Sequence, residues 1–317
     1  MAYKNKKIAF VFPGQGAQYV GMGMEFIDKN PQLLEPLRRF DQRNGTSLEE
    51  IIRNGPEEEL KETRYTQPAI LYHSIIAMQS LLKELDLKPD YVAGHSLGEI
   101  TALVANGVLN LEDAMYLVHK RGEFMIKANQ GEPFAMAAII GLDAEVLKQI
   151  CLDVSQEHLI VVANYNTPEQ IVISGSEEGV NRASELAKEK GAKRALPLAV
   201  GGPFHSPMIE KAGLWLGEEM SKMSFNSTAI PVISNVDAKP HFDPNTIREN
   251  LVKQVTSSVL WVDSIKEMVS LGVELFIEFG PKRVVSGMIK KIDRNVDTLS
   301  IDEWQDIVTV KEYMEKL

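Results

Sequence analysis

Cysteine is almost absent from this chain, which contains a single one, Cys151, in 317 residues. One thiol cannot form an internal disulfide, and it cannot supply a metal cluster built from cysteine ligands. We expect Cys151 to be a buried and inert thiol.

Long hydrophobic runs are also missing. No stretch approaches the roughly 18 apolar residues that a membrane-spanning helix needs. The apolar run at residues 8–12 is too short for the core of a signal peptide, and a glycine-rich loop follows it. These absences predict a cytoplasmic protein that does not contact membranes.

An excess of positive charge is the third missing feature. The formal net charge is −10. Broad binding of nucleic acid needs a basic face, so we expect no nucleic-acid partner. Apolar residues make up 44% and charged residues 25% of the chain, which is ordinary for a globular protein.

Strand-like and helix-like segments alternate along most of the chain, which favours an α/β fold. The order changes near residue 130. Residues 133–199 have the pattern of strand, helix, two strands, helix and strand, which is typical of a ferredoxin-like unit. After residue 203 the α/β alternation returns, so this compact unit is an insert.

The stretch Gly94-His95-Ser96-Leu97-Gly98 places a serine between two glycines, after an apolar strand and before a helix. This pattern is a nucleophile elbow, whose glycines allow a sharp bend and leave the hydroxyl accessible. At the start of the helix, the free N–H of Leu97 and the helix dipole favour a developing negative charge. The same pattern also arises by chance in loops, so the alternative for Ser96 is a polar residue without a catalytic role.

A catalytic serine needs a general base. His205 has the most site-like setting among the six histidines, because two glycines and a proline precede it and a helix follows. His95 adjoins the serine, but neighbouring side chains diverge on an elbow. The others lie within helices or polar loops: His73, His119, His158 and His241. No acid that orients His205 is evident, since neither Asp237 nor Asp243 has a telling context, and a backbone carbonyl or an amide could replace it.

A glycine-rich loop follows the first strand, in the stretch FVFPGQGAQYVGMG at residues 10–23. Its spacing matches neither the dinucleotide-binding nor the P-loop motif. We interpret it as a strand-end loop that approaches a substrate closely and in which Gln15 donates an N–H to an oxyanion. A plain glycine-rich turn is the alternative.

Nine stretches together resemble the malonyl-CoA:acyl carrier protein transacylase family, in that family's order and at its spacing. They are FVFPGQGAQYVGMG (10–23), TQPAIL (66–71), VAGHSLGEITAL (92–103), VHKRGEFM (118–125), ANYNTPEQIVISG (163–175), GGPFHSPMI (201–209), PVISNVD (231–237), LVKQVTSSVLW (251–261) and FIEFGP (276–281). Related acyltransferase domains of polyketide synthases share most of them. The resemblance covers nearly the whole chain.

The resemblance implies a ping-pong transfer of malonyl from malonyl-CoA to the phosphopantetheine thiol of holo acyl carrier protein. Ser96 matches the nucleophile and His205 matches its base. Gln254 matches a glutamine whose neighbouring backbone carbonyl orients the histidine. The backbone N–H groups of Gln15 and Leu97 match the oxyanion hole. The chemistry implies no cofactor and no metal.

Three further residues match positions that bind the acyl group. Arg121 matches the arginine that binds the malonyl carboxylate, and a guanidinium makes bidentate, charge-assisted hydrogen bonds that an uncharged acetyl group cannot accept. Phe204 leaves little room for an α-methyl branch and so favours malonyl over methylmalonyl. Asn164 is a further substrate-binding position. Without the resemblance, a surface ion pair would be the simpler interpretation of Arg121.

These observations predict an α/β protein in two domains. A large α/β-hydrolase-like domain would be formed by residues 1–128 and 202–317. A small ferredoxin-like domain, residues 129–201, would be inserted in it. We expect a monomer.

Three alternatives compete with this function. A serine hydrolase of acyl thioesters shares the elbow, but it predicts an acid and gives Arg121 no role. A non-catalytic scaffold that binds acyl carrier protein would not need both Ser96 and His205. A free-standing acyltransferase serving a polyketide synthase has the same motifs and is not separated by them.

Acyl carrier proteins are acidic, and so is this chain, so docking requires a local basic patch. Candidate basic residues occur in two groups, which are Lys188, Lys190, Lys193 and Arg194 in the insert and Lys282, Arg283, Lys290 and Lys291 in the large domain. Our hypothesis is that one group borders the mouth of the site.

Overall fold

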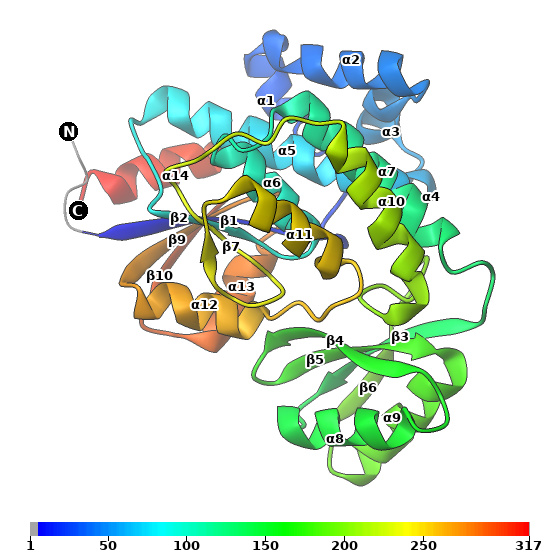
Figure 1. Cartoon of the computed structure of the whole chain (residues 1–317). Helices are drawn as coiled ribbons and strands as arrows, with labels where there is room; N and C mark the ends of the chain where they lie inside the picture. Colours follow the sequence, from blue (N-terminus) through cyan, green and yellow to red (C-terminus); the bar gives the residue numbers. More distant parts are fainter. Residues whose placement is uncertain (1–5, 317) are drawn as a thin grey trace.

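The computed structural model describes residues 6–316 and shows a mixed α/β protein with two separate β-sheets (Figure 1). The α/β class predicted from the alternation of segments is therefore confirmed. One sheet has six strands and the other has four.

The larger sheet has the strand order β10-β9-β1-β2-β7-β8. Its strands are β1 (Lys7–Phe12), β2 (Tyr91–Gly94), β7 (Val232–Ile233), β8 (Pro240–His241), β9 (Val273–Phe279) and β10 (Asp297–Ile301). Neighbouring strands are parallel, except that β8 runs antiparallel to β7. Phe12 at the end of β1 pairs with Gly94 at the end of β2. The loops that follow these two strands therefore leave the sheet side by side, at the edge where parallel sheets place their sites.

Strand β1 is buried on both faces. Ile8, Phe10 and Phe12 belong to a core that includes residues of α5 (Thr63–Glu84) and α6 (Leu97–Ala105). Ala9 and Val11 face the opposite way, into a core with residues of α12 (Trp261–Ser270) and α13 (Val284–Ile292). A strand covered on both faces is apolar throughout, which accounts for the sequence of this one.

We call the six-stranded sheet and the helices packed around it the larger part of the protein. Its remaining helices surround this sheet and the helices named above (Figure 1). They are α1 (Met24–Lys29), α2 (Glu35–Asn44), α3 (Leu48–Asn54), α4 (Glu57–Leu60), α7 (Leu111–Lys127), α10 (Glu210–Ser221), α11 (Pro244–Gln254) and α14 (Trp304–Met314), with the 3-10 helices η1 (Pro31–Leu34) and η2 (Pro207–Ile209). Asn110 is the N-cap of helix α7, because its side chain accepts a hydrogen bond from the N–H of Asp113, and asparagine directly before a helical segment is a local sequence signal for such a cap.

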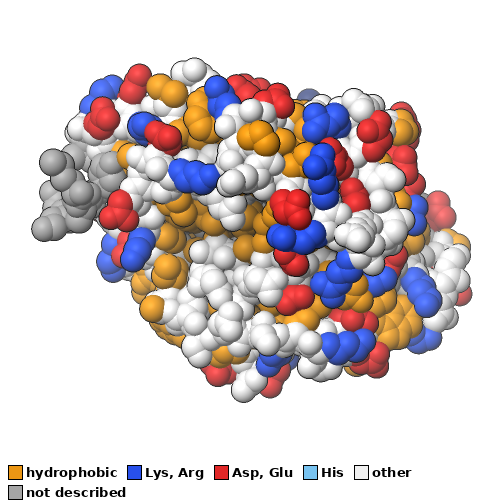
Figure 2. All heavy atoms as spheres, turned by 90° about the horizontal axis from the view of Figure 1, so that it is seen from above, with side chains coloured by type: hydrophobic (Ala, Val, Ile, Leu, Met, Phe, Trp, Pro, Cys, Tyr) orange, Lys and Arg blue, Asp and Glu red, His pale blue; other side chains and the backbone are white. Residues whose placement is uncertain are grey.

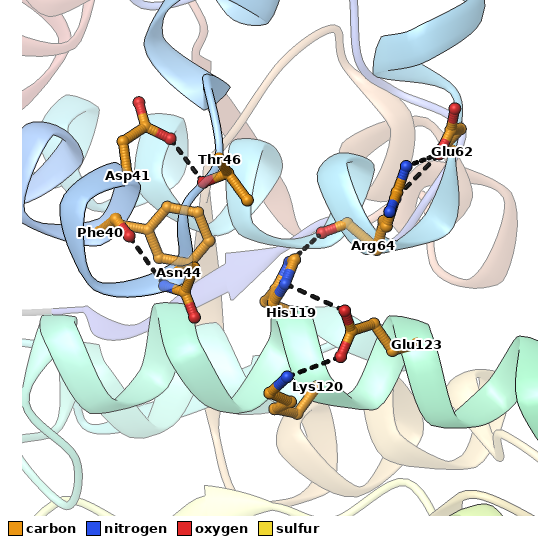
Figure 3. A network of polar contacts seen from close by, with 9 residues as sticks. All are labelled: Phe40, Asp41, Asn44, Thr46, Glu62, Arg64, His119, Lys120 and Glu123. Atoms are coloured by element: carbon orange, nitrogen blue, oxygen red, sulfur yellow. Dashed lines mark hydrogen bonds and ion pairs between the residues drawn. The ribbon is translucent and has the colours of Figure 1, made fainter.

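Residues 67–85 are apolar nearly all round, which predicts a buried helix over this range. Helix α5 is buried along most of its length, but it begins at Thr63, four residues before that range. It contains Pro68, which has no N–H to donate to the carbonyl of Arg64. His119 of α7 supplies the missing donor, since its Nδ1 lies 2.9 Å from Arg64 O (Figure 3). The ring of His119 also packs edge-on against Phe40. His119 is thus a buried link between helices, which is a structural role.

The smaller sheet has the order β4-β5-β3-β6, and all its neighbouring strands are antiparallel. Its elements are β3 (Phe134–Ile140), α8 (Ala144–Val154), β4 (Ile160–Thr167), β5 (Gln170–Ser176), α9 (Glu177–Glu189) and β6 (Arg194–Pro197). Helices α8 and α9 cover one face of this sheet (Figure 1). Cys151 on α8 is buried in that core, which raises the pKa of its thiol to about 12.

The other face of the smaller sheet packs on the larger part. Met136, Ala138 and Val172 belong to the same core as β1 and α5. Strand β4 is also tied to the segment that follows α11, because Tyr165 N donates to Val259 O and Val259 N donates to Ala163 O. This second contact brings the smaller sheet beside the end of α11.

Residues 230–236 (IPVISNV) have a composition typical of one strand, and the structure departs from this pattern. Strand β7 has only two residues. The chain turns after it, and Asn235 leaves the sheet to bind the backbone around Ser96. The hydrogen bonds of Asn235 to the backbone around Ser96 therefore take the place of further strand pairing after Ile233.

Acidic and basic side chains are intermixed on the face shown in Figure 2, around a hollow that is lined by apolar side chains. Among residues 6–316, no helix combines the length and apolarity that crossing a membrane requires.

Candidate active site

Ser96 lies between β2 and α6 in a backbone conformation that serine rarely adopts, with φ 53° and ψ −106°. The flanking glycines make this bend possible. A Cβ on Gly94 would lie 1.9 Å from the backbone of Gly98, and a Cβ on Gly98 would lie 2.2 Å from the carbonyl of Phe12. The glycines of the predicted elbow are therefore required by close backbone approach.

Asn235 stabilises the bend. Its Oδ1 accepts a hydrogen bond of 2.7 Å from the N–H of Ser96, and its Nδ2 donates one of 2.8 Å to the carbonyl of Gly94. Asn235 is fully buried. Its role was not predicted from the sequence, although it lies in one of the stretches that carry the family resemblance.

His205 contacts the serine directly. Its Nε2 lies 2.8 Å from Ser96 Oγ, and its Nδ1 lies 2.8 Å from the backbone carbonyl of Gln254. A carbonyl only accepts, so Nδ1 carries the hydrogen and Nε2 is free to accept the proton of Ser96. Asp237 instead pairs with His241, and Asp243 caps the start of α11. Neither aspartate therefore orients His205.

Burial and the neighbouring charge of Arg121 lower the pKa of His205 to about 3. A neutral imidazole at ordinary pH is the form that a general base requires.

Arg121 reaches the serine from α7. The residue is only 2% exposed, and its Nη2 lies 3.0 Å from Ser96 Oγ. Nη2 also donates to Gln254 Oε1 at 2.9 Å, and Nη1 donates to Gln67 Oε1 at 2.9 Å. Burial lowers the pKa of Arg121 to about 10, so the guanidinium remains charged at neutral pH.

The neighbouring Gly122 explains how Arg121 comes so close to α5. A Cβ on Gly122 would lie 2.8 Å from the Cα of Arg64 and from the carbonyl of Thr63. Only a glycine allows α7 to touch the first turn of α5, and this contact places Arg121 next to Gln67. Arg121 is buried and bound to neutral oxygens, so its interpretation as a member of a surface ion pair is wrong.

Gln15 and Leu97 lie on the two loops that leave the sheet side by side. Leu97 is buried and is the first residue of α6, so its N–H has no acceptor within the helix. The side chain of Gln15 is exposed and its Nε2 donates to Thr63 Oγ1 at 3.3 Å. A Cβ on the preceding Gly14 would lie 2.8 Å from the carbonyl of His95, so the two loops are in contact.

Phe204 is 8% exposed and lies directly before His205. Asn164 is buried on β4, beside Val259. Within residues 6–316, no hydrogen bond joins the Asn164 side chain to Ser96, His205 or Arg121. The nearby Asn166 instead contacts the elbow, because its Oδ1 lies 2.7 Å from His95 Nε2.

Two other residues whose roles were not predicted from the sequence, Glu99 and Gln67, complete the polar surroundings of the site. Glu99 is 1% exposed, and its Oε2 accepts a hydrogen bond of 2.7 Å from Gln254 Nε2. Glu99 lies three residues after the elbow serine, but the sequence gives no sign that its carboxylate is buried. In the described part of the chain, no group of three or more His, Cys, Asp or Glu side chains is placed to hold a metal ion.

Known proteins resemble this chain over nearly its whole length. Residues 9–303 match the family model described as an acyl transferase domain. The chain is 46% identical over 302 residues to a malonyl CoA-acyl carrier protein transacylase from Bacillus subtilis, which covers 95% of each protein.

Solved structures give the same result. A malonyl-CoA:acyl carrier protein transacylase from Xanthomonas oryzae pv. oryzae has a TM-score of 0.93 at 38% identity, covering 98% of both chains. A malonyl-transacylase in complex with its type II PKS acyl-carrier protein has a TM-score of 0.93 at 36% identity, covering 97% of this chain and 99% of that one. This chain therefore belongs to the malonyl-CoA:acyl carrier protein transacylase family.

Proposed function

We propose that this protein transfers the malonyl group from malonyl-CoA to the phosphopantetheine thiol of an acyl carrier protein, by a ping-pong mechanism through a malonyl-Ser96 intermediate. One observation carries the proposal. The hydroxyl of Ser96 lies between a neutral imidazole, His205 Nε2 at 2.8 Å, and a guanidinium, Arg121 Nη2 at 3.0 Å.

In the first half-reaction, Ser96 Oγ attacks the thioester carbon of malonyl-CoA while His205 Nε2 takes the hydroxyl proton. The backbone N–H groups of Leu97 and Gln15 stabilise the oxyanion that forms on the thioester oxygen. The carbon–sulfur bond then breaks, and His205 returns the proton to the leaving thiolate of coenzyme A.

The second half-reaction repeats these steps with the thiol of the carrier. His205 accepts the thiol proton, the thiolate attacks the ester carbon of malonyl-Ser96, and the ester bond breaks. The proton returns to Ser96 Oγ, and malonyl leaves as a thioester of the carrier. No cofactor takes part in this scheme.

Arg121 gives the site its preference for malonyl. We infer that the carboxylate of the substrate binds the guanidinium through charge-assisted hydrogen bonds and takes over the contact that Ser96 Oγ occupies here. Phe204 lies next to His205 and restricts room for a branched acyl group. Asn164 is proposed as a further contact of the substrate, at the side where β4 meets the larger part.

We also propose the finer description of the fold. The strand, turn and helix around Ser96 support an α/β-hydrolase-like domain of residues 1–128 and 202–317. The element order of residues 129–201 and the strand order β4-β5-β3-β6 support a ferredoxin-like insert. The separate core between α8, α9 and their sheet supports the same division.

The test is the mass of the intact protein after brief incubation with malonyl-CoA, for the wild type and Ser96→Ala. We expect a malonyl-sized increase on the wild type alone, which is lost when holo acyl carrier protein is added. Steady release of free malonate without an adduct would instead favour a serine hydrolase. Absence of both an adduct and turnover would contradict the proposal and favour the scaffold.

The similar malonyl-transacylase that binds a type II PKS carrier keeps a polyketide role open as the second candidate. Transfer rates to a fatty-acid carrier and to a polyketide carrier would separate the two. The monomeric state and the cytoplasmic location stay predictions.

A further inference from the structure

A buried carboxylate that the proposed reaction does not use lies beside the site. Glu99 is on the first turn of α6 and is 1% exposed. Its Oε2 accepts hydrogen bonds from Asn235 N at 3.0 Å and from Gln254 Nε2 at 2.7 Å. A buried acid is costly unless its acceptors are satisfied, so its presence here requires an explanation.

The side-chain amide of Gln254 has one orientation that satisfies its neighbours. Its Nε2 faces three acceptors, which are Ser96 O at 3.0 Å, Glu99 Oε2 at 2.7 Å and Asn235 Oδ1 at 3.3 Å. Its Oε1 faces a donor, Arg121 Nη2, at 2.9 Å. A carboxylate cannot donate, so Glu99, which makes the shortest of the three contacts and carries the negative charge among them, favours this orientation over the reversed amide, in which Oε1 would face the acid.

This orientation determines what holds the guanidinium. Within residues 6–316, the hydrogen bonds of Arg121 go to neutral oxygens, those of Gln67, Gln254 and Ser96. The negative charge of Glu99 lies one amide away and acts on Arg121 without contacting it. A carboxylate in direct contact would occupy the guanidinium and compete with the carboxylate of a substrate.

We propose that Glu99 is a positioning residue for acyl selectivity, which fixes the Gln254 amide so that a neutral oxygen holds Arg121 beside Ser96. This inference rests on the proposed function. The general base does not depend on the orientation of this amide, because His205 Nδ1 donates to the backbone carbonyl of Gln254 and not to its side chain. Loss of Glu99 should therefore disturb the selection of the acyl group more than the nucleophile.

The test substitutes Glu99→Gln, which keeps size but adds a donor. A neutral amide oxygen accepts a weaker hydrogen bond from Gln254 Nε2 than the carboxylate does, and the new NH₂ can donate to Gln254 Oε1 in the reversed amide, so the orientation that presents an oxygen to Arg121 is no longer fixed. We expect the ratio of kcat/KM for malonyl-CoA to that for acetyl-CoA to fall about tenfold or more, as for the loss of one hydrogen bond to a charged group. Labelling of Ser96 by an uncharged fluorophosphonate should change less than about threefold, because the base remains in place.

Burial raises the pKa of Glu99 to about 7, and the hydrogen bonds from Asn235 and Gln254 oppose this shift. The comparison is therefore made at about pH 8, where the ionised carboxylate predominates.

Two further variants make the test specific. Gln254→Met removes the amide and should lower the selectivity ratio by itself, and adding Glu99→Gln to it should have no further effect. Glu278→Gln is the matched control. Glu278 is a fully buried carboxylate that accepts the N–H groups of Val284, Val285 and Ser286 at the start of α13, far from Arg121 in the chain and without contact to it. Its substitution should leave the ratio unchanged.

Three results would overturn the inference. They are an unchanged ratio in Glu99→Gln, an equal loss in selectivity and in fluorophosphonate labelling, and a full additional loss when Glu99→Gln is combined with Gln254→Met. If Glu99→Gln does not fold, Gln254→Met alone decides the question. An unchanged selectivity ratio in that variant would also overturn the inference. Failure of the wild type to form malonyl-Ser96 would overturn the proposed function itself, and it is seen before any variant is compared.

Discussion

Arg121 Nη2 lies 3.0 Å from Ser96 Oγ, so the proposed carboxylate-binding group and the proposed nucleophile touch before any substrate is bound. The hydroxyl accepts from the guanidinium and donates to His205 Nε2, at 2.8 Å. A substrate carboxylate must replace the first contact while the second is kept. Ser96 Oγ therefore makes one contact with the group proposed to select the acyl group and a second contact with the base proposed to activate the serine. A substitution can remove the first contact and keep the second.

The first prediction concerns this separation. Arg121→Met keeps most of the buried volume and removes the charge. We expect kcat/KM for malonyl-CoA to fall about 100-fold, because up to two hydrogen bonds to a charged group are lost, at about 1.5–3 kcal/mol each. Acylation by acetyl-CoA, which has no carboxylate to bind, should change far less.

Steady-state kinetics with the two thioesters, measured in parallel, check this prediction. Arg121→Lys is the control that keeps the charge but loses bidentate geometry, and it should lie between the wild type and Arg121→Met. An equal loss of kcat/KM for malonyl-CoA and acetyl-CoA would show that Arg121 acts on the reactivity of Ser96 and not on the choice of the acyl group.

The second prediction is a pH dependence. Burial and the charge of Arg121 lower the pKa of His205 from 6.5 to about 3. The base form is therefore present in the folded protein throughout mildly acidic solution. Removal of the Arg121 charge should raise the pKa of His205, so the acid limb of the rate of Ser96 acylation by acetyl-CoA should move to higher pH in Arg121→Met.

The pH profile of kcat/KM for acetyl-CoA, which reports the free enzyme, measures this shift. Superimposable profiles of the wild type and Arg121→Met would contradict it. The same pKa has a consequence for stability. The unfolded chain binds a proton at His205 below about pH 6.5, whereas the folded protein does not, so this contribution to stability is present above that pH and is lost as the pH falls toward 3.

The third prediction concerns the elbow. In Gly98→Ala the new Cβ would lie 2.2 Å from the carbonyl of Phe12, a backbone atom that cannot move aside. We expect the free energy of unfolding to fall by about 1–3 kcal/mol or more, and acylation of Ser96 to be lost as β1 and α6 separate.

Urea denaturation measures the change in stability. Gly287→Ala is the matched control, because Gly287 is also helical and nothing lies within 4 Å of its added Cβ. That control should be stabilised by about 0.5–1 kcal/mol, since alanine restricts the unfolded chain and favours the helix. Equal effects of the two substitutions would show that close packing at Gly98 is unimportant.

Local patterns made much of the fold predictable. The apolar run of β1, the cap at Asn110 and the two glycines around Ser96 each act within a few residues, so the sequence displays their physical cause. No elements were predicted for residues 24–62, although Gly45 and Gly55 end two of the four α-helices found there. Strand β7 was overestimated, because the tertiary contact of Asn235 with the elbow overrides the strand pattern around it.

The site was predictable where a residue has a local setting or matches the family. Ser96 was found from its glycines, and His205 from its loop. Gln254 and Arg121 were found only through the resemblance, because helical neighbours give no sign of what their side chains reach. Glu99 and Asn235 were not selected, since each acts through contacts to residues more than 100 positions away in the chain. No local pattern encodes such contacts.

The last prediction concerns docking of the acidic carrier. Of the two basic groups, the one that begins at Lys282 borders the loop that carries Gln15, because Lys282 Nζ lies 3.5 Å from Gln18 O. Lys190 follows α9, on the outer side of the smaller sheet (Figure 1). Lys282 is therefore the residue of these two that is placed near the mouth of the site.

Lys282→Glu should raise the KM for acyl carrier protein at least about fivefold, since the loss of one exposed attraction of about 1 kcal/mol accounts for that factor and a repulsion adds to it. The KM for malonyl-CoA should be unchanged, and the effect should shrink in high salt because exposed charges are screened. Lys190→Glu makes the same change of charge at a distant exposed site and should leave both constants unchanged. If Lys190→Glu alone raised the KM for the carrier, the docking surface would lie on the insert, and the mouth of the site would have to be approached from the side of the smaller sheet.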